Sequence, residues 1–350
     1  MDRFRVRRVS RSLLNSLRPR SANAWDRVIW GATLTYLVVI LAAAWVLWTL
    51  ADRWWVATVL LFGPRWVLAM PLLLLIPVIL MRDRALLAPL ALAAWVALGP
   101  VMGLRTGWRR LFISPRPSDL RVMTFNTEGG RAMSWAPGPV LDALGVEVAA
   151  FQECGGRLVD AIDAMTEWHT DTRGGACLVS RFPIRSVEAM DRSPFLAAGG
   201  SGLVVTYRLD VDGRDLYLTN VHLETPREGL ELLRAGRVSE GAPMLEGKSF
   251  LRDIEHRFAR RWVDTLPSPR LVIGDFNSPP ESPMFRAHWG SWQNAFSLTG
   301  IGLGGSRVNG WIRARIDHVL ADTSWTVVRA WLGPDLGSDH LPMLAEVRLH

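Results

Sequence analysis

The sequence feature that most constrains the fold is an uncharged run from residue 28 to residue 50, VIWGATLTYLVVILAAAWVLWTL. About 20 consecutive apolar residues are needed to cross the hydrocarbon core of a bilayer as a helix. Two shorter apolar runs follow, at 66–81 between Arg65 and Arg82 and at about 85–104. Each shorter run alone is compatible with a buried helix of a soluble protein, but three in succession predict a helical transmembrane anchor of about three spans. No small-residue cleavage pattern follows a short apolar core, which disfavours a cleaved signal peptide.

The placement of arginines predicts the orientation of this anchor. The arginines that precede the first run are Arg3, Arg5, Arg7, Arg8, Arg11, Arg18, Arg20 and Arg27. Only Arg53 and Arg65 lie between the first and second runs, so the positive-inside bias places the N-terminus in the cytoplasm. Three crossings of an inner or plasma membrane then place the rest of the chain outside the cytoplasm. The alternative is that the second run is re-entrant, which Arg105, Arg109 and Arg110 after the third run would favour.

Charge is divided unevenly along the chain. Residues 1–112 carry 15 arginines and 4 acidic residues, whereas residues 113–350 carry 25 basic and 29 acidic residues; the two net charges, +11 and −4, give the +7 of the whole chain. The basic character therefore belongs to the anchor and its tail. A C-terminal domain with an acidic balance lacks the broad cationic surface of a sequence-independent DNA-binding protein.

The pattern predicts four segments: a basic cytoplasmic tail at 1–27, the anchor at 28–104, a linker at 105–118 and a C-terminal domain at 119–350. The linker contains the Pro-containing stretch FISPRPS at 112–118. Cys154 and Cys177 are too few for a disulfide framework, and their spacing matches no metal-binding pattern. We interpret them as buried small residues; a single disulfide is the alternative, which an extracytoplasmic location would permit.

Short β-rich runs separated by turns fill the C-terminal domain. They lie at 120–126, 146–152, 176–180, 203–209, 215–223, 271–276, 316–321 and 343–349. Helical periodicity is present around 156–166 and 247–265. Strands interleaved with a few helices predict a layered α/β sandwich of two sheets rather than a doubly wound parallel sheet.

Polar residues that can bind a hard cation or move a proton recur at the ends of these runs. They are Asn126, Glu153, Asn220, His222, Asp275, Asn277, Asp317, Asp339 and His340. Taken singly, such residues are usually turn formers or helix caps. A strand end is also rigid enough to aim a side chain, and the loop that follows keeps it accessible.

The ordered set resembles the endonuclease/exonuclease/phosphatase superfamily, which includes DNase I-like nucleases and neutral sphingomyelinases. The most specific strings are GDFN at 274–277 and SDHLP at 338–342, and the resemblance covers about residues 119–349. It implies a four-layer α/β/β/α sandwich with the active site at one edge of the paired sheets. It also implies in-line attack of water on a phosphoester, assisted by Mg²⁺ or Mn²⁺.

The resemblance assigns roles to individual residues. Metal contacts are implied for Asn126, Glu153 and Asp339, and oxygen ligands suit a hard divalent cation. Catalytic roles are implied for His222, Asp275, Asn277, Asp317 and His340, with Asp317 orienting His340. Phosphate contacts are implied for Asn220, Asn277 and His222.

Two positions depart from the family pattern. Glu128 stands where some relatives carry another acidic residue, and Gly174–Gly175 stand where the DNase I-like branch has an acidic partner for its histidine. The second departure disfavours a DNase I-like activity without affecting the general mechanism.

Three functions are compatible with these observations. The leading prediction is a membrane-anchored, metal-dependent phosphoesterase that acts on a phosphodiester or phosphomonoester presented near the bilayer. The second is a membrane-tethered nuclease acting on extracytoplasmic DNA or RNA, with Arg181, Arg313 and Arg315 as contributors to a local cationic groove. The third is a non-catalytic binding protein on the same fold.

Overall fold

The computed structural model describes residues 23–116, 119–130 and 135–350, so most of the predicted basic tail lies outside the described residues. The chain forms two compact units. The first combines the chain up to Val46 with Arg65–Gly103, and the second combines Leu47–Pro64 with Leu104–His350. This division differs from the predicted segments, because residues 47–64 were placed in the anchor and 105–118 in a linker.

The first unit is built from apolar helices. They are α2 (Ala24–Thr49), which runs on into the second unit, η1 (Arg65–Ala69) with α4 (Met70–Arg82), and η2 (Arg84–Leu86) with α5 (Leu87–Val96) and the π-helical η3 (Ala97–Val101). Within the described residues, three helical stretches are long and apolar enough to cross a membrane, by length and composition: Ala24–Thr49, Arg65–Arg82 and Arg84–Val101. Leu73 and Leu74 are 73% and 74% exposed. Exposed fractions this large are expected for apolar side chains on a helix that is surrounded by lipid.

Polar groups in the first unit bond to one another. Trp30 Nε1 donates to Asp83 Oδ2 at 2.9 Å, and Tyr36 Oη donates to the Leu68 carbonyl at 3.0 Å. Arg65 donates to the Val101 carbonyl at 2.8 Å. Such bonds are required where no water is available to satisfy polar groups.

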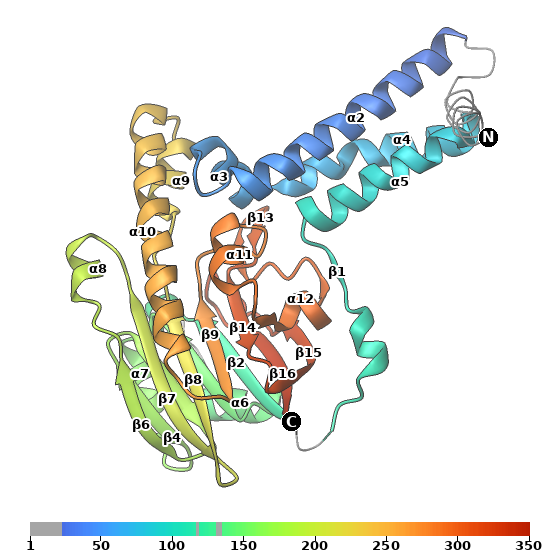
Figure 1. The fold of residues 1–350 in the computed structure, drawn as a ribbon. Coiled ribbons are helices and arrows are strands. Elements are labelled where there is room, and N and C mark those ends of the chain that lie inside the picture. The colour runs from blue at the N-terminus through green and yellow to red at the C-terminus, as the bar shows by residue number, and fades with distance from the viewer. Residues whose placement is uncertain (1–22, 117–118, 131–134) are drawn as a thin grey trace, which may run out of the picture. The chain divides into compact units, whose positions relative to one another are not determined.

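Two six-stranded sheets form the centre of the second unit (Figure 1). One has the order β10-β14-β9-β8-β7-β6 and the other β15-β16-β2-β3-β5-β4. The strands of the first sheet are β6 (Ile184–Ala189), β7 (Leu203–Val211), β8 (Arg214–His222), β9 (Arg270–Asp275), β10 (Gln293–Asn294) and β14 (Asp317–Ala321). Those of the second are β2 (Leu120–Asn126), β3 (Val148–Gln152), β4 (His169–Arg173), β5 (Ala176–Ser180), β15 (Trp325–Leu332) and β16 (Met343–Leu349).

Helices cover the outer face of each sheet. α6 (Pro137–Leu144) and α7 (Arg157–Asp163) cover one sheet, and α10 (Val238–Asp264) and α11 (Pro283–Trp289) cover the other. α8 (Ser193–Ala197) and α9 (Arg227–Arg234) pack against α10, whereas α12 (Ala295–Thr299) contributes Ala295 and Phe296 to the core between the sheets. Val122 and Ile273 belong to the core between the sheets, whereas Met123 packs with α6 and α7 and Val272 packs with α10 and α11. Because alternate residues of one strand enter different cores, both faces of each sheet are buried. The central strands are therefore nearly continuous apolar runs in the sequence. The predicted four-layer α/β/β/α sandwich is confirmed.

The strands that the sequence did not reveal lie at sheet edges. β4, β6 and β15 occupy edge positions in the strand orders. In β6, Arg185, Ser186 and Glu188 alternate poorly with apolar residues, and most of the strand is exposed. The weak pattern of β6 follows from its edge position, because only part of its surface enters a core. β15 is also an edge strand, but it is apolar, so its position does not explain why the sequence did not reveal it.

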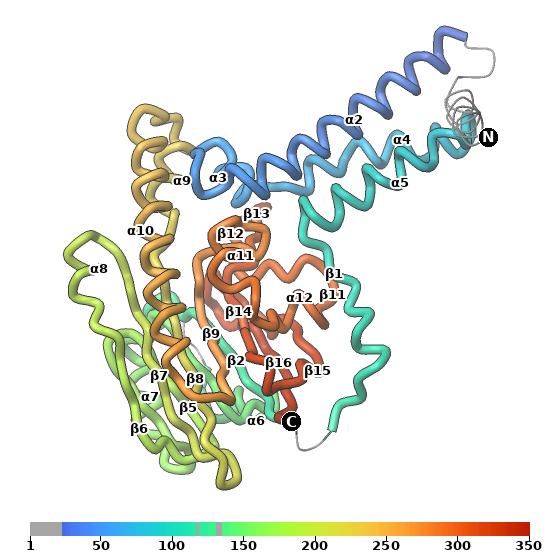
Figure 2. Tube along the Cα trace, viewed as in Figure 1, coloured from blue at the N-terminus to red at the C-terminus, as the bar shows by residue number. Residues whose placement is uncertain are grey.

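Two short segments pack within the second unit. α3 (Trp55–Phe62) contacts α10. β1 (Arg105–Thr106) pairs with β11 (Ile301–Gly302), and the tube in Figure 2 shows them side by side. Residues of the predicted linker are therefore folded against the sandwich.

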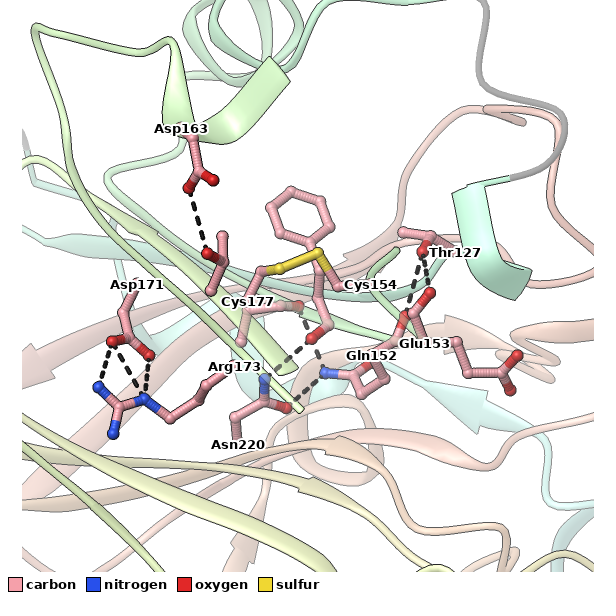
Figure 3. The surroundings of a disulfide bond; sticks show 12 residues. Thr127, Gln152, Glu153, Cys154, Asp163, Asp171, Arg173, Cys177 and Asn220 are labelled. Carbon is pink, nitrogen blue, oxygen red and sulfur yellow. Dashed lines mark hydrogen bonds and ion pairs between the residues drawn. A yellow bond between two sulfur atoms is a disulfide. The ribbon is translucent and has the colours of Figure 1, made fainter. Parts of the chain in front are cut away.

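Cys154 and Cys177 form a disulfide, which corrects the interpretation of two separate buried cysteines. β3 and β5 are antiparallel neighbours in which Phe151 is opposite Cys177, so Cys154 just beyond β3 is brought within bonding reach. Figure 3 shows the Glu153 side chain extending away from the disulfide. The bridge thus fixes the end of β3 directly beside Glu153.

Candidate active site

The ends of two pairs of parallel strands bring the predicted residues together. β2 runs parallel to β3 in one sheet, and β8 runs parallel to β9 in the other. The carboxyl ends of parallel neighbours lie at the same sheet edge. Asn126 Nδ2 lies 3.0 Å from Glu153 Oε1 and 3.0 Å from Asp275 Oδ2, so one amide connects both sheets.

Asp317 and His340 form a buried pair. Asp317 lies opposite Asp275 in the β9–β14 register, and its Oδ2 is 2.8 Å from His340 Nδ1. His340 N donates to Ser338 Oγ, and Ser338 Oγ donates to the Asn126 carbonyl, which ties this loop to β2. Burial lowers the pKa of His340, but the Asp317 carboxylate, with Asp275 and Asp339, outweighs it and raises the pKa to about 9.

Asp275 lies at the centre of the site. Its Oδ2 is 3.9 Å from His340 Nε2 and 3.9 Å from His222 Nε2. Burial and the nearby charge of Asp317 raise the pKa of the Asp275 carboxyl. A carboxylate made more basic in this way is a better proton acceptor near neutral pH.

Asn277 is held by its backbone and by its side chain. Its N–H donates to Asp275 Oδ1 at 2.9 Å, and Nδ2 donates to the Leu223 carbonyl at 2.8 Å. Its φ of 48° lies in the left-handed region, which asparagine tolerates better than most residues. The sharp turn after β9 therefore places Asn277 beside Asp275.

His222 ends β8 directly opposite Asp275 in the β8–β9 register. Its Nε2 is 3.7 Å from Glu153 Oε1, and its side chain is 18% exposed. In the described part of the chain, Glu153 and Asp275 are the carboxylates nearest to it.

The structure does not bring Asn220 to the site surface, which corrects its predicted phosphate contact. The residue is fully buried. Its Nδ2 donates to the Phe151 carbonyl at 3.0 Å, and its Oδ1 accepts from Gln152 Nε2 at 2.7 Å. Asn220 therefore joins β8 to β3 beneath the site and positions the strand that carries His222.

Asp339 faces two arginines. Its Oδ2 accepts from Arg227 at 2.7 Å and from Arg307 at 2.8 Å, while its Oδ1 lies 3.7 Å from His340 Nε2. Two guanidinium partners make this carboxylate a poorer cation ligand than Glu153 in this arrangement. The sequence pattern did not single out Arg227 or Arg307, because neither lies in a motif.

A third arginine supports the turn that carries Asn277. Arg252 of α10 is fully buried and donates to the Asn277 carbonyl at 2.7 Å and to Ser278 Oγ. The Arg252 guanidinium also donates to Oδ1 of Asp52, at 3.3 Å, and Asp52 lies just before α3. No local signal could have identified this link, since the partners are 200 residues apart.

Two arginines predicted as part of a cationic groove are engaged elsewhere. Arg181 pairs with Asp142 and lies over the Trp168 ring, 3.7 Å from its centroid. Arg315 is buried near Glu281, at 3.5 Å. Arg313 is exposed. This placement does not assemble the predicted groove.

The oxygen atoms around Asn126 fit a hard divalent cation. Glu153 offers a partly exposed carboxylate, and Asp275 offers a buried one whose pKa is raised by burial and by the nearby charge of Asp317. Among the described residues, Asp275, Asp317 and His340 form another group of possible ligand atoms, which lie within 4.8 Å of one another. We favour the Glu153 side, because Asp317 Oδ2 and His340 Nδ1 are already bonded to each other.

Comparison with known proteins identifies the family. The family model for the endonuclease/exonuclease/phosphatase family matches residues 123–340. The chain belongs to the endonuclease/exonuclease/phosphatase family. Members of this family generally hydrolyse phosphoesters and use a divalent metal.

Several solved structures match about two thirds of the chain. A humanized D. rerio TDP2 is 17% identical, with a TM-score of 0.49 over 66% of this chain and 99% of that one. A Beutenbergia cavernae family member is 18% identical, with a TM-score of 0.44 over 66% and 72%. A Bacteroides vulgatus member is 13% identical, with a TM-score of 0.46 over 67% and 100%. No curated protein matches the chain.

Proposed function

We propose that this chain is a membrane-anchored, Mg²⁺-dependent phosphoesterase that hydrolyses a phosphodiester or phosphomonoester by in-line attack of water. The observation that carries the proposal is the arrangement of Asp275 between His340 and His222, with Asn126 bonded to both Asp275 and Glu153. The family generally catalyses this class of reaction.

Each group has a defined part in the proposed reaction. Asp275 accepts a proton from the attacking water as the new O–P bond forms, and Asn277 orients a non-bridging oxygen. His340, kept charged by Asp317, stabilises negative charge on the phosphate. His222 donates a proton to the leaving oxygen as the old P–O bond breaks.

Glu153 is the residue that we propose to hold the metal, with Mn²⁺ as an alternative to Mg²⁺. Asn126, whose Nδ2 donates to the Glu153 carboxylate, would position that ligand. A bound divalent cation neutralises charge that develops on the phosphate and leaving oxygens. Asp339 is reassigned to ordering Arg227 and Arg307, which supply positive charge near the substrate.

The compact second unit supports an extracytoplasmic location. Leu47–Pro64 and Leu104–His350 belong to this one unit, and we propose that both lie on the same side of a membrane. The intervening residues must therefore cross an even number of times, which agrees with spans at Arg65–Arg82 and Arg84–Val101. With a cytoplasmic N-terminus and α2 as the first span, the second unit lies outside the cytoplasm.

Two further observations favour this location. The Cys154–Cys177 disulfide suits an oxidising compartment. Arg110, one of the arginines that favoured the opposite orientation, donates to the Thr299 and Ala330 carbonyls and so has a structural role. A C-terminal reporter that is active only outside the cytoplasm tests the location, and an inactive but expressed fusion would contradict it.

The activity is tested with the full chain in lipid nanodiscs, because α3 and β1 are parts of the folded unit. We expect hydrolysis of p-nitrophenyl phosphate or bis-p-nitrophenyl phosphate with Mg²⁺, loss with a chelator, and loss in Glu153→Ala. Activity unchanged by both treatments would contradict the metal assignment. Rapid DNA degradation without either phosphoesterase activity would favour the nuclease, and no activity on any substrate would favour a binding protein.

A further inference from the structure

A cavity of about 380 Å³ lies within the second unit, next to α3, α9 and the hairpin of β12 (Arg307–Asn309) and β13 (Ile312–Ala314). Apolar side chains form much of its wall: Trp55, Val59, Phe62, Leu230, Leu233 and Ile312. Its volume lies in the range of small-molecule binding sites. All of its lining residues belong to the second unit, so the cavity does not depend on how the two units are arranged.

The same cavity reaches the candidate active site. Asn277 lines it, and the Asn277 backbone N–H is bonded to Asp275. Arg227 and Arg307 also line it, and both donate to Asp339, the neighbour of His340. An occupant of the cavity would therefore be in contact with residues that we assign to the phosphate.

The distribution of polarity indicates the chemistry of that occupant. The arginines and Asn277 suit an anionic phosphoester. The remaining polar lining residues include Glu231 and Asn309, which are exposed to solvent. A nucleobase needs hydrogen-bonding partners for its edges, whereas an alkyl chain needs only apolar surface.

We infer that this cavity binds the apolar chain of an amphiphilic phosphoester whose phosphate lies beside Asn277 and His340. The inference rests on the proposed phosphoesterase function and names its substrate class. α3 joins the first two candidate spans, since α2 ends at Thr49 and η1 begins at Arg65. The chain between α3 and each of these candidate spans is only a few residues long, and amphiphilic phosphoesters concentrate in bilayers.

The test uses the full chain in nanodiscs with a series of alkyl p-nitrophenyl phosphodiesters carrying methyl, butyl and hexyl groups. All three release p-nitrophenol, so only the alkyl group differs. We expect kcat/KM to rise by up to about fourfold for each methylene that enters the cavity, giving at least about a tenfold preference for hexyl over methyl. Thymidine p-nitrophenyl phosphate serves as the nucleoside substrate, and faster hydrolysis of this compound than of the hexyl ester would overturn the inference.

Variants at Leu230 test whether the preference for the hexyl over the methyl diester arises in this cavity. Leu230→Asp should reduce the hexyl-to-methyl ratio to near one, whereas Leu230→Met should retain it. Leu196→Asp is the matched control, because Leu196 is 52% exposed on α8 and does not line the cavity. If Leu230→Asp fails to fold, Leu230→Trp, which narrows the cavity, should lower the ratio in its place; an unchanged ratio in a folded variant would contradict the inference.

A binding measurement separates this inference from the proposed function. Calorimetry with methyl phosphate and hexyl phosphate in the presence of Mg²⁺ should show tighter binding of the hexyl compound by a similar factor. If neither these diesters nor p-nitrophenyl phosphate is hydrolysed but this binding preference persists, the phosphoesterase proposal fails and the cavity assignment stands. If the diesters are hydrolysed and neither measurement depends on chain length, the cavity assignment fails alone.

Discussion

His222 at the end of β8 and His340 in the segment before β16 both approach Asp275 at the end of β9, and each Nε2 is 3.9 Å from Asp275 Oδ2. Their surroundings differ. The His340 side chain is 5% exposed and bonded to Asp317, whereas the His222 side chain is 18% exposed and has Glu153 at 3.7 Å. An imidazole held by a buried carboxylate keeps its proton and one orientation, while an imidazole nearer to solvent can exchange its proton with a leaving group. From this contrast we propose that His340 supplies positive charge and that His222 transfers a proton.

The largest expected effect is the loss of His340. His340→Ala should lower kcat by about 10³-fold for any leaving group, because it removes positive charge aimed at the phosphate. The measurement is kcat at saturating Mg²⁺ and substrate, with His169→Ala on the exposed strand β4 as the matched histidine control. A decrease in kcat of less than about tenfold would show that another group supplies the positive charge that stabilises the phosphate.

The loss of His222 should depend on the leaving group. His222→Ala should lower kcat by about 10²-fold for a simple alcohol leaving group and much less for p-nitrophenol, which departs without protonation. Comparing diesters with these two leaving groups in both histidine variants separates the two roles. Equal losses for both leaving groups in His222→Ala would remove the distinction between the histidines.

The charge on His340 should depend on Asp317. In the metal-free protein the pKa of His340 is raised to about 9, so the ion pair stabilises the fold fully below about pH 6.5 and this stabilisation is lost as pH rises through 9. Asp317→Asn should return the pKa toward 6.5. NMR of histidine-labelled protein measures it directly, and an unchanged pKa in the variant would show that Asp317 is not the dominant partner.

The smallest expected effect concerns the Cys154–Cys177 disulfide, which adjoins Glu153, the carboxylate 3.7 Å from His222. Replacing both Cys154 and Cys177 by alanine should raise the Mg²⁺ concentration for half-maximal activity about three- to tenfold, because Glu153 precedes Cys154 and is held at a φ of 49°. The kcat at saturating Mg²⁺ should remain near that of the unmodified chain. A metal titration of the double variant checks this, and a loss of kcat with unchanged metal dependence would instead link the disulfide to catalysis.

The sequence alone predicted much of the fold of the second unit. Val122 and Met123 enter different cores, so both faces of β2 are apolar and the run at 120–126 is recognisable without its neighbours. β6 at a sheet edge lacks this signal, and its polar residues conceal the strand. Prediction therefore succeeded where burial is complete on both sides and failed at the edges.

The candidate site divides in the same way. The sequence identified Asn126, Glu153, His222, Asp275 and His340 as polar residues at strand ends, and the structure brings these together. It misjudged Asn220, whose position two residues before His222 suggests a shared role but whose amide is fully used between the sheets. Local spacing does not reveal which polar side chains are already satisfied by a distant partner.

By itself, the sequence determined the apolar spans, the strands buried on both faces and the polar residues at their ends, because these patterns depend on neighbouring positions. Only the tertiary structure decided the pairings: Asn126 with Asp275 across 149 residues, Cys154 with Cys177, and Asp339 with Arg227 and Arg307. It also decided that α3 belongs with the sandwich and lines an apolar cavity beside Asn277. Hydrogen bonds, charge pairs and cavities form between segments that are distant in the sequence. Sheet register and packing bring those segments together, and the local spacing of residues predicts neither the register nor the packing.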